Sequence, residues 1–142
     1  MSLQTDPACR ILALKEGHDG CVAFLKGPDL LFSVEAEKDS NRRFAPVGVQ
    51  TWMDSARLSP ELPDVLAHSG WSQGTDPRGA PIGAGYSGLS YVVSAQTHFG
   101  LPVTVFNTSH ERSHILCAYG MSPFPQGVAC YCLLWEGHFG AL

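Results

Sequence analysis

The chain has 142 residues and a net charge of -4 at neutral pH, with 44% hydrophobic and 15% charged residues. This size and balance suit one globular domain with a sizeable core, and the negative charge gives no general attraction to nucleic acid or to an anionic membrane. The longest apolar run is far shorter than a bilayer span, and the opening MSLQTDPACR lacks the apolar core of a signal peptide. These features predict a cytoplasmic protein without nucleic-acid or membrane partners.

The cysteine content is an odd number without paired C-x-x-C spacing. We therefore expect reduced and mostly buried thiols rather than disulfides or a zinc cluster. The five residues are Cys9, Cys21, Cys117, Cys130 and Cys132.

The first forty residues predict three consecutive antiparallel strands, at 11–14, 21–25 and 30–37. The loop before the second strand places His18 and Asp19 between Gly17 and Gly20. Backbone N–H groups of such a loop can face a phosphate, while the histidine or the aspartate acts on whatever is held there. The alternative is a tight hairpin with surface polar residues.

A polar and partly basic segment follows the third strand. Lys38, Arg42 and Arg43 are its basic residues, and they could bind a phosphate or an acidic substrate. A solvated loop is the alternative for this segment.

The middle of the chain predicts a helix over 51–58, a strand over 64–69 and another strand over 102–106. Between the last two, the glycine-rich segment 72–90 predicts a functional or a disordered loop. The period of residues 89–99 fits a helix or a strand.

The segment from Thr108 to Gly137 carries the strongest chemical signal. A helix is predicted to begin just before His110, because Thr108 and Glu111 have capping-box spacing, and it would place His110 and His114 on one face. The turn at 122–127 and the apolar run 128–135 predict a final buried strand that ends at Glu136. Two imidazoles and a carboxylate predict a site for a divalent transition metal; the alternative is a solvated helix face.

The strands at 102–106 and 128–135 are expected in the same sheet as residues 10–36. An apolar strand this close to the last residue would be an unpaired edge, which complete domains usually avoid. The chain is therefore expected to be a fragment of a longer protein.

Three motifs occur in order along the chain: ILALKEGHDGCVAFL, VEAEKDSNRR and HERSHI followed by YGMSPF. This set resembles the antibiotic- and nodulation-type O-carbamoyltransferases, which share a catalytic domain with the enzymes that make threonylcarbamoyl-adenosine in tRNA. The resemblance implies an α/β mixed sheet with the actin/hexokinase-like (ribonuclease H-like) ATPase fold. Residues 1–142 would be the N-terminal portion of the catalytic domain, without the donor-activating domain, in a protein that could form a homodimer.

The resemblance also implies ATP and carbamoyl phosphate as donors, magnesium with the nucleotide, carbamoyl-adenylate as intermediate and a hydroxyl acceptor. His110 and His114 match the family's metal-binding pair, for which iron(II) is implied. Glu136 stands where the family has aspartate, and a further ligand would lie beyond residue 142. His18 matches the histidine of the family's N-terminal His-Asp loop and would serve as general base. The WEG sequence at 135–137 favours a cephem-type acceptor, and segment 72–90 is where acceptor selectivity is expected.

HERSH also satisfies H-E-x-x-H, the zinc-peptidase pattern in which Glu111 would be the general base. Cys117 stands where the extended metzincin pattern has glycine, and this pattern leaves residues 11–43 unexplained. A non-catalytic binding module is a third alternative.

Overall fold

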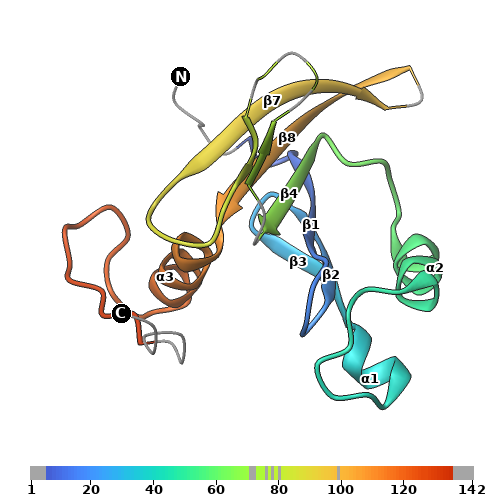
Figure 1. Cartoon of the computed structure of the whole chain (residues 1–142), viewed down its shortest axis with the longest axis horizontal. Coiled ribbons are helices and arrows are strands. Elements are labelled where there is room, and N and C mark those ends of the chain that lie inside the picture. Colours follow the sequence, from blue (N-terminus) through green and yellow to red (C-terminus); the bar gives the residue numbers. More distant parts are fainter. Residues whose placement is uncertain are drawn as a thin grey trace.

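The computed structural model describes residues 6–70, 73–75, 77, 79, 81–98 and 100–135. Figure 1 shows a sheet with helices packed on it and the chain's last described residues folded back beside one helix. The strands are β1 (Arg10–Lys15), β2 (Cys21–Lys26), β3 (Asp29–Glu35), β4 (Val65–Gly70), β5 (Gln73–Thr75), β6 (Pro81–Ala84), β7 (Tyr91–His98) and β8 (Leu101–Ser109), and the helices are α1 (Ala36–Ser40), α2 (Val49–Leu58) and α3 (His110–Gly120).

Six strands form one mixed sheet in the order β3-β2-β1-β4-β8-β7. The strands β1, β4 and β8 run parallel, whereas β2, β3 and β7 pair antiparallel with their neighbours. The predicted α/β class, the antiparallel opening strands and the placement of 102–106 in the same sheet are confirmed. The strands β5 and β6 form a separate two-stranded hairpin.

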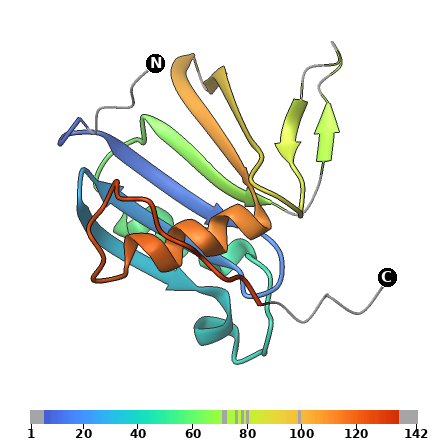
Figure 2. The ribbon, with the colours of Figure 1, turned by 90° about the vertical axis from the view of Figure 1, so that its left-hand side faces the viewer.

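Successive side chains of β1 lie on opposite faces of the sheet, so neighbouring residues pack on the sides of different helices. Leu12 lies against α2 in one cavity, whereas its neighbour Ala13 lies on the side that α3 covers. Figure 2 shows α3 in front of the sheet and α2 behind it. The buried core is small in the described part of the chain: Val22 and Phe24, on the central part of β2, are fully buried, and Leu14 of β1 is 8% exposed.

The third strand ends at Glu35, two residues before the predicted end at residue 37. Ala36 opens the short helix α1 instead of extending the strand, and it is buried there. Its backbone N–H donates to the carbonyl oxygen of Gly20, so the contact with the β1–β2 loop replaces a further ladder pair. Lys38 therefore lies on a helix rather than in the expected loop.

Residues 89–99, which the sequence left undecided, form β7. Part of the glycine-rich segment is also regular, since it contains the β5–β6 hairpin. The prediction of one long loop over 72–90 is therefore wrong, although an ordered loop follows β6.

The predicted strand over 128–135 is wrong as well. These residues form no strand, and the side chains of Tyr131, Leu133 and Trp135 are almost fully exposed. A strand requires a neighbour for its backbone hydrogen bonds, whereas this segment runs back beside α3 and joins neither edge of the sheet. The helix break at 122–127 is confirmed, because α3 ends at Gly120. No helix in the described part of the chain is long and apolar enough to span a membrane.

Candidate functional site

The carboxyl ends of β1, β4 and β8 meet at one edge of the sheet. In open α/β sheets, ligands bind outside the carboxyl ends of parallel strands, at the point where successive connections leave in opposite directions. Such a point lies between β1 and β4, since β2 pairs on the other side of β1. The predicted histidines follow this edge: His18 comes after β1 and His110 directly after β8.

His110 and His114 lie side by side on α3, as their spacing predicts. Their Nε2 atoms are 3.0 Å apart, and their rings meet edge to face at 4.5 Å between centroids. His110 is buried, with 4% of its surface exposed, whereas His114 is exposed to solvent. The pair therefore joins a buried ring to an accessible one at the carboxyl end of β8.

The cap of α3 differs from the prediction by one residue. Ser109 is the N-cap residue, and its hydroxyl accepts a hydrogen bond from the N–H of Arg112. Thr108 is still part of β8. The carboxylate of Glu111 accepts from the N–H of Gly88 rather than closing a capping box. The helix nevertheless begins at His110 because serine, like threonine, satisfies a first-turn amide.

A loop of the glycine-rich segment covers the start of α3. The carbonyl oxygens of Gly85 and Tyr86 accept from the N–H groups of His110 and Glu111, at 3.2 and 3.1 Å. The Tyr86 ring stacks on the His110 ring, with 4.7 Å between centroids and 25° between planes. Gly85 and Gly88 have φ of 80° and 78°, which glycine adopts without strain. This loop brings a tyrosine to the metal-binding candidate, and sequence spacing contained no signal for it.

His18 and Asp19 interact directly in the loop after β1. The Nδ1 atom of His18 lies 2.8 Å from Asp19 Oδ2, and both side chains are about half exposed. Gly20, in contrast, is pressed against the 46–47 backbone, where a Cβ would lie 2.4 Å from the nitrogen of Val47. Its N–H donates to Ala45, so the chain itself occupies this amide. Gly17 stays open, with no atom near its Cβ position.

The basic residues lie on the same side of the molecule as this loop. The guanidinium of Arg43 lies 4.8 Å from the centre of the Phe44 ring, and that ring meets the His18 ring edge on at 6.3 Å. Arg42 precedes Arg43 in the turn after α1, whereas Lys38 pairs with Glu35 at 3.7 Å. The structure thus joins Arg43 to His18, while β4 separates this group from the histidine pair on α3.

Sequence reasoning missed one polar pair at this edge. His68, near the end of β4, has its Nδ1 atom 3.5 Å from Glu16 Oε1 at the end of β1. A polar residue near the carboxyl end of a predicted strand was the available signal, but only the parallel pairing of β1 and β4 reveals the partner.

The third predicted metal ligand, Glu136, lies outside the described residues. Among those described, no three His, Cys, Asp or Glu side chains are close enough together to hold an ion. Leu134, two residues before Glu136, lines a cavity of about 200 Å³ together with His114. The hydroxyl of Tyr119 accepts from the N–H of Gly127 at 2.7 Å, which holds the turn that sends the chain back along α3.

The cysteines are free, as expected, but they are not mostly buried. Cys117, Cys130 and Cys132 are exposed, and the other two are partly exposed. The expectation of buried thiols is wrong because three of the five lie on α3 and the segment after it, where little of the chain covers them. Loss of hydration and a hydrogen bond with the Cys132 thiol raise the pKa of Cys130.

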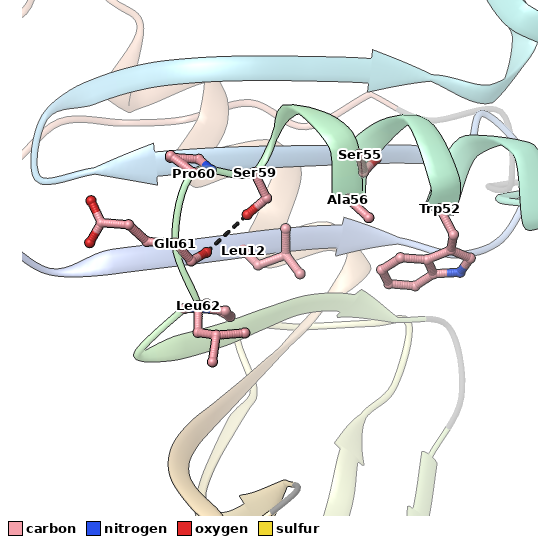
Figure 3. A pocket seen from close by; sticks show the side chains of 9 residues that line it. Leu12, Trp52, Ser55, Ala56, Ser59, Pro60, Glu61 and Leu62 are labelled. Carbon is pink, nitrogen blue, oxygen red and sulfur yellow. Dashed lines mark hydrogen bonds between the residues drawn. The ribbon is translucent and has the colours of Figure 1, made fainter.

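A larger cavity, of about 430 Å³, lies between α2, β1 and residues 59–63 (Figure 3). Its walls are mainly apolar, with Leu12 and Trp52 facing into it. The polar groups are already engaged: the hydroxyl of Ser59 donates to the backbone of Glu61, whose carboxylate pairs with Arg10 and Lys26. The cavity therefore offers no acid–base or metal-binding chemistry, and the candidate site stays at the strand ends.

The chain is similar to three characterised proteins over about nine tenths of its length. It is 44% identical over 132 residues to a 3'-hydroxymethylcephem-O-carbamoyltransferase from Amycolatopsis lactamdurans, covering 92% of this chain and 25% of that protein. A protein of the same name from Streptomyces clavuligerus is 41% identical over 133 residues, with the same coverage. Nodulation protein U from Rhizobium tropici is 29% identical over 157 residues, covering 90% of this chain and 26% of that protein.

The chain thus spans about a quarter of the length of these relatives. No protein-family model and no solved structure matches it.

Proposed function

The chain is homologous to the N-terminal part of the cephem- and nodulation-type O-carbamoyltransferases, and from this premise we propose that it belongs to an enzyme that transfers a carbamoyl group to a hydroxyl of a small natural product. The 44% identity to the Amycolatopsis enzyme over 92% of the chain carries this proposal. The histidine pair at the carboxyl end of β8 supports it independently, because it lies where open α/β sheets bind ligands.

We propose the actin/hexokinase-like, ribonuclease H-like fold for the domain. An antiparallel β3-β2-β1 meander followed by the parallel strands β4 and β8 supports this assignment. Because β1, β4 and β8 are parallel, their carboxyl ends lie at one edge of the sheet, where ATP with magnesium would bind. The remainder of the domain and a donor-activating domain would lie in the longer protein.

His110, His114 and Glu136 would hold one divalent ion, with iron(II) favoured because two histidines and one carboxylate leave coordination positions open. Two nitrogen ligands of a tetrahedral ion lie roughly 3.3 Å apart at usual bond lengths. The 3.0 Å between the two Nε2 atoms is close to this spacing. When bound, the ion would offset charge on the phosphate or carbamoyl oxygens.

The His18–Asp19 pair would act on the acceptor. A carboxylate at one ring nitrogen orients the imidazole and leaves the other nitrogen able to accept a proton. The acceptor oxygen would form a bond to the carbamoyl carbon of carbamoyl-adenylate, itself made from carbamoyl phosphate and ATP. The bond from that carbon to the phosphate oxygen would break, AMP would leave with the electron pair, and His18 would take the hydroxyl proton.

Anion binding near His18 would come from Arg43, Arg42, Lys38 and the open backbone at Gly17, whereas Gly20 would serve mainly to let the 46–47 backbone approach. The contact of Arg43 with Phe44, and of Phe44 with His18, supports one common binding surface. A 3'-hydroxymethylcephem is the favoured acceptor, since two relatives that are 44% and 41% identical to the chain carry that substrate in their names.

The zinc-peptidase alternative requires the Glu111 carboxylate to activate a water at the histidine pair. That carboxylate instead accepts the N–H of Gly88 and ties the loop to the helix. Glu111 is therefore occupied by a structural contact, and the carbamoyltransferase proposal is preferred.

A chimera tests the proposal. Residues 1–142 of this chain would replace the matching quarter of the Amycolatopsis relative, and the carbamate ester of 3'-hydroxymethylcephem would be measured by mass spectrometry with ATP and carbamoyl phosphate supplied. We expect product from the chimera and its loss, at least a hundredfold, in His114→Ala, because removal of a transition-state interaction of about 2.7 kcal/mol has this effect. The unmodified relative is the control. A folded chimera that makes no product would overturn the proposal.

A further inference from the structure

The loop 85–90 is bound to the start of α3 more closely than a simple connection between strands requires. Besides the two backbone bonds from Gly85 and Tyr86, the hydroxyl of Ser109 donates to the Gly88 carbonyl at 2.6 Å. The N–H of Ser109 donates to Ser90 at 3.0 Å. These contacts hold the first residues of the loop against His110 and Glu111, and its last residues against Ser109.

Two rings define the orientation of His110. Tyr86 lies nearly parallel to it on one side, and His114 meets it nearly perpendicularly, with 77° between planes. A histidine ring turns readily about its last side-chain bond, which has a broad torsional preference. The stacked tyrosine removes that freedom, because rotation of His110 would drive its edge into the Tyr86 ring. Burial of His110 at 4% exposure leaves little space for another position.

We propose that Tyr86 is a positioning residue for the His110–His114 pair, setting the plane of the His110 ring so that its Nε2 faces that of His114. The proposal rests on the proposed function insofar as the pair binds a metal ion. Residues around a metal ligand that fix its ring orientation typically alter metal affinity by 10–100-fold when they are replaced. Tyr86 would exert this effect through ring contact, without coordinating the ion.

The same geometry predicts how the tyrosine can be replaced. Phenylalanine retains the stacked ring, so Tyr86→Phe should keep the orientation of His110. Tyr86→Ala removes the ring and leaves the backbone carbonyl that caps Glu111 in place. Tyr91→Ala is a matched control, because Tyr91 also stacks on an aromatic ring, that of Phe106 at 5.8 Å, and its own ring lies 4.9 Å from the guanidinium of Arg112 on α3.

The experiment uses the chimera of this chain with the Amycolatopsis relative, freed of metal, and titrates it and its three variants with cobalt(II), monitored by the visible spectrum of the bound ion. We expect Tyr86→Ala to bind cobalt(II) at least tenfold more weakly than wild type, as for other residues that orient metal ligands. Tyr86→Phe and Tyr91→Ala should bind like wild type. Equal affinity of Tyr86→Ala and wild type would overturn the positioning role.

A second measurement keeps this role testable independently of the metal. In the metal-free chain, nuclear Overhauser contacts between the rings of His110 and His114 should persist in Tyr86→Phe and disappear in Tyr86→Ala. Their persistence in Tyr86→Ala would refute the inference. An unsubstituted chimera that binds no cobalt(II) would refute the proposed metal site, and the ring contacts would then decide the role of Tyr86.

Discussion

Glu111 shows how a single residue can satisfy a catalytic motif and yet have another role. It occupies the second position of H-E-x-x-H, but its carboxylate accepts a backbone hydrogen bond from the loop that covers His110. The motif is a local pattern, whereas the hydrogen bond comes from a residue 23 positions earlier in the chain. The role of Glu111 is therefore determined by the fold around it.

Replacement of Glu111 separates these roles. Glu111→Gln keeps an oxygen that can accept from Gly88, so we expect carbamate formation by the chimera to stay within about twofold of the unsubstituted chimera. Glu111→Ala removes the acceptor and should destabilise the chain by about 1.5–3 kcal/mol, the usual contribution of a hydrogen bond to a charged group. Thermal unfolding of both variants provides the comparison. Loss of transfer in Glu111→Gln with unchanged stability would contradict the structural role.

His68 shows the same dependence on the fold at a second position. Its sequence context predicts only a strand, but the parallel register of β4 on β1 brings it to Glu16. The pair lies between the His18 loop and the α3 histidines along the strand ends, and no local pattern connects its two members.

Among the elements, the opening meander is tied to the segment before β4 by charged groups. Arg10 at the start of β1 pairs with Asp64 and Glu61, and Lys26 at the end of β2 pairs with Glu61 at 2.6 Å. Hydrogen bonds from Arg10 lower the pKa of Asp64, and the bond from Lys26 is the main cause of the lowered pKa of Glu61. These contacts hold the parallel pairing of β1 and β4 at its amino end.

This network predicts a dependence of stability on pH. Because the folded state lowers both carboxyl pKa values, the unfolded chain binds more protons as the pH falls. The stabilisation is therefore complete above the ordinary pKa of these groups, near 4, and is lost as the pH falls through the folded values. Asp64→Asn should flatten the acid side of the profile, measured by urea unfolding between pH 3 and about pH 7. Asp29→Asn, at the exposed first residue of β3, is the control, and equal profiles for wild type and Asp64→Asn would contradict the prediction.

At the scale of the whole molecule, the segment 128–135 is important because most of its apolar side chains are exposed. Its apolar sequence is typical of a buried strand, but it lies beside α3 with Tyr131, Leu133 and Trp135 at 107%, 90% and 87% exposure. Exposed apolar groups of this extent mark surfaces that bind other protein segments. In a protein as long as the relatives, other segments would cover these three side chains. The small core of this chain agrees with that expectation.

We therefore expect the isolated chain to associate with other copies of itself. Light scattering coupled to size exclusion should show a mass that rises with concentration in the micromolar range, where exposed apolar surface promotes aggregation. Leu133→Lys together with Trp135→Lys should restore a monomer, since charges on an exposed strand-like segment oppose pairing. Lys26→Gln is unsuitable as a control because it breaks an ion pair, whereas Gln96→Lys on the exposed face of β7 is suitable. A monomer at all concentrations would contradict this expectation.

The isolated chain is also expected to be inactive in carbamoyl transfer.

The sequence by itself determined the features that depend on neighbouring residues. Turn residues and alternation predict β1, β2 and β3, and the spacing of four between His110 and His114 places both imidazoles on one helix face. The ordered motifs also led to the carbamoyltransferase family, to which the compared relatives are assigned by name. These properties are encoded within short stretches of the chain.

The tertiary structure decided what depends on chain segments that are distant in sequence. It brought Tyr86 onto His110 and His68 to Glu16, and it left residues 128–135 without a neighbouring strand. The physical reason is that a ring contact or a strand needs a partner, and the partner is chosen by the packing of the sheet and its helices rather than by local propensity. An apolar run indicates only that a segment is stabilised by burial. The segments that cover it are determined by the remainder of the fold.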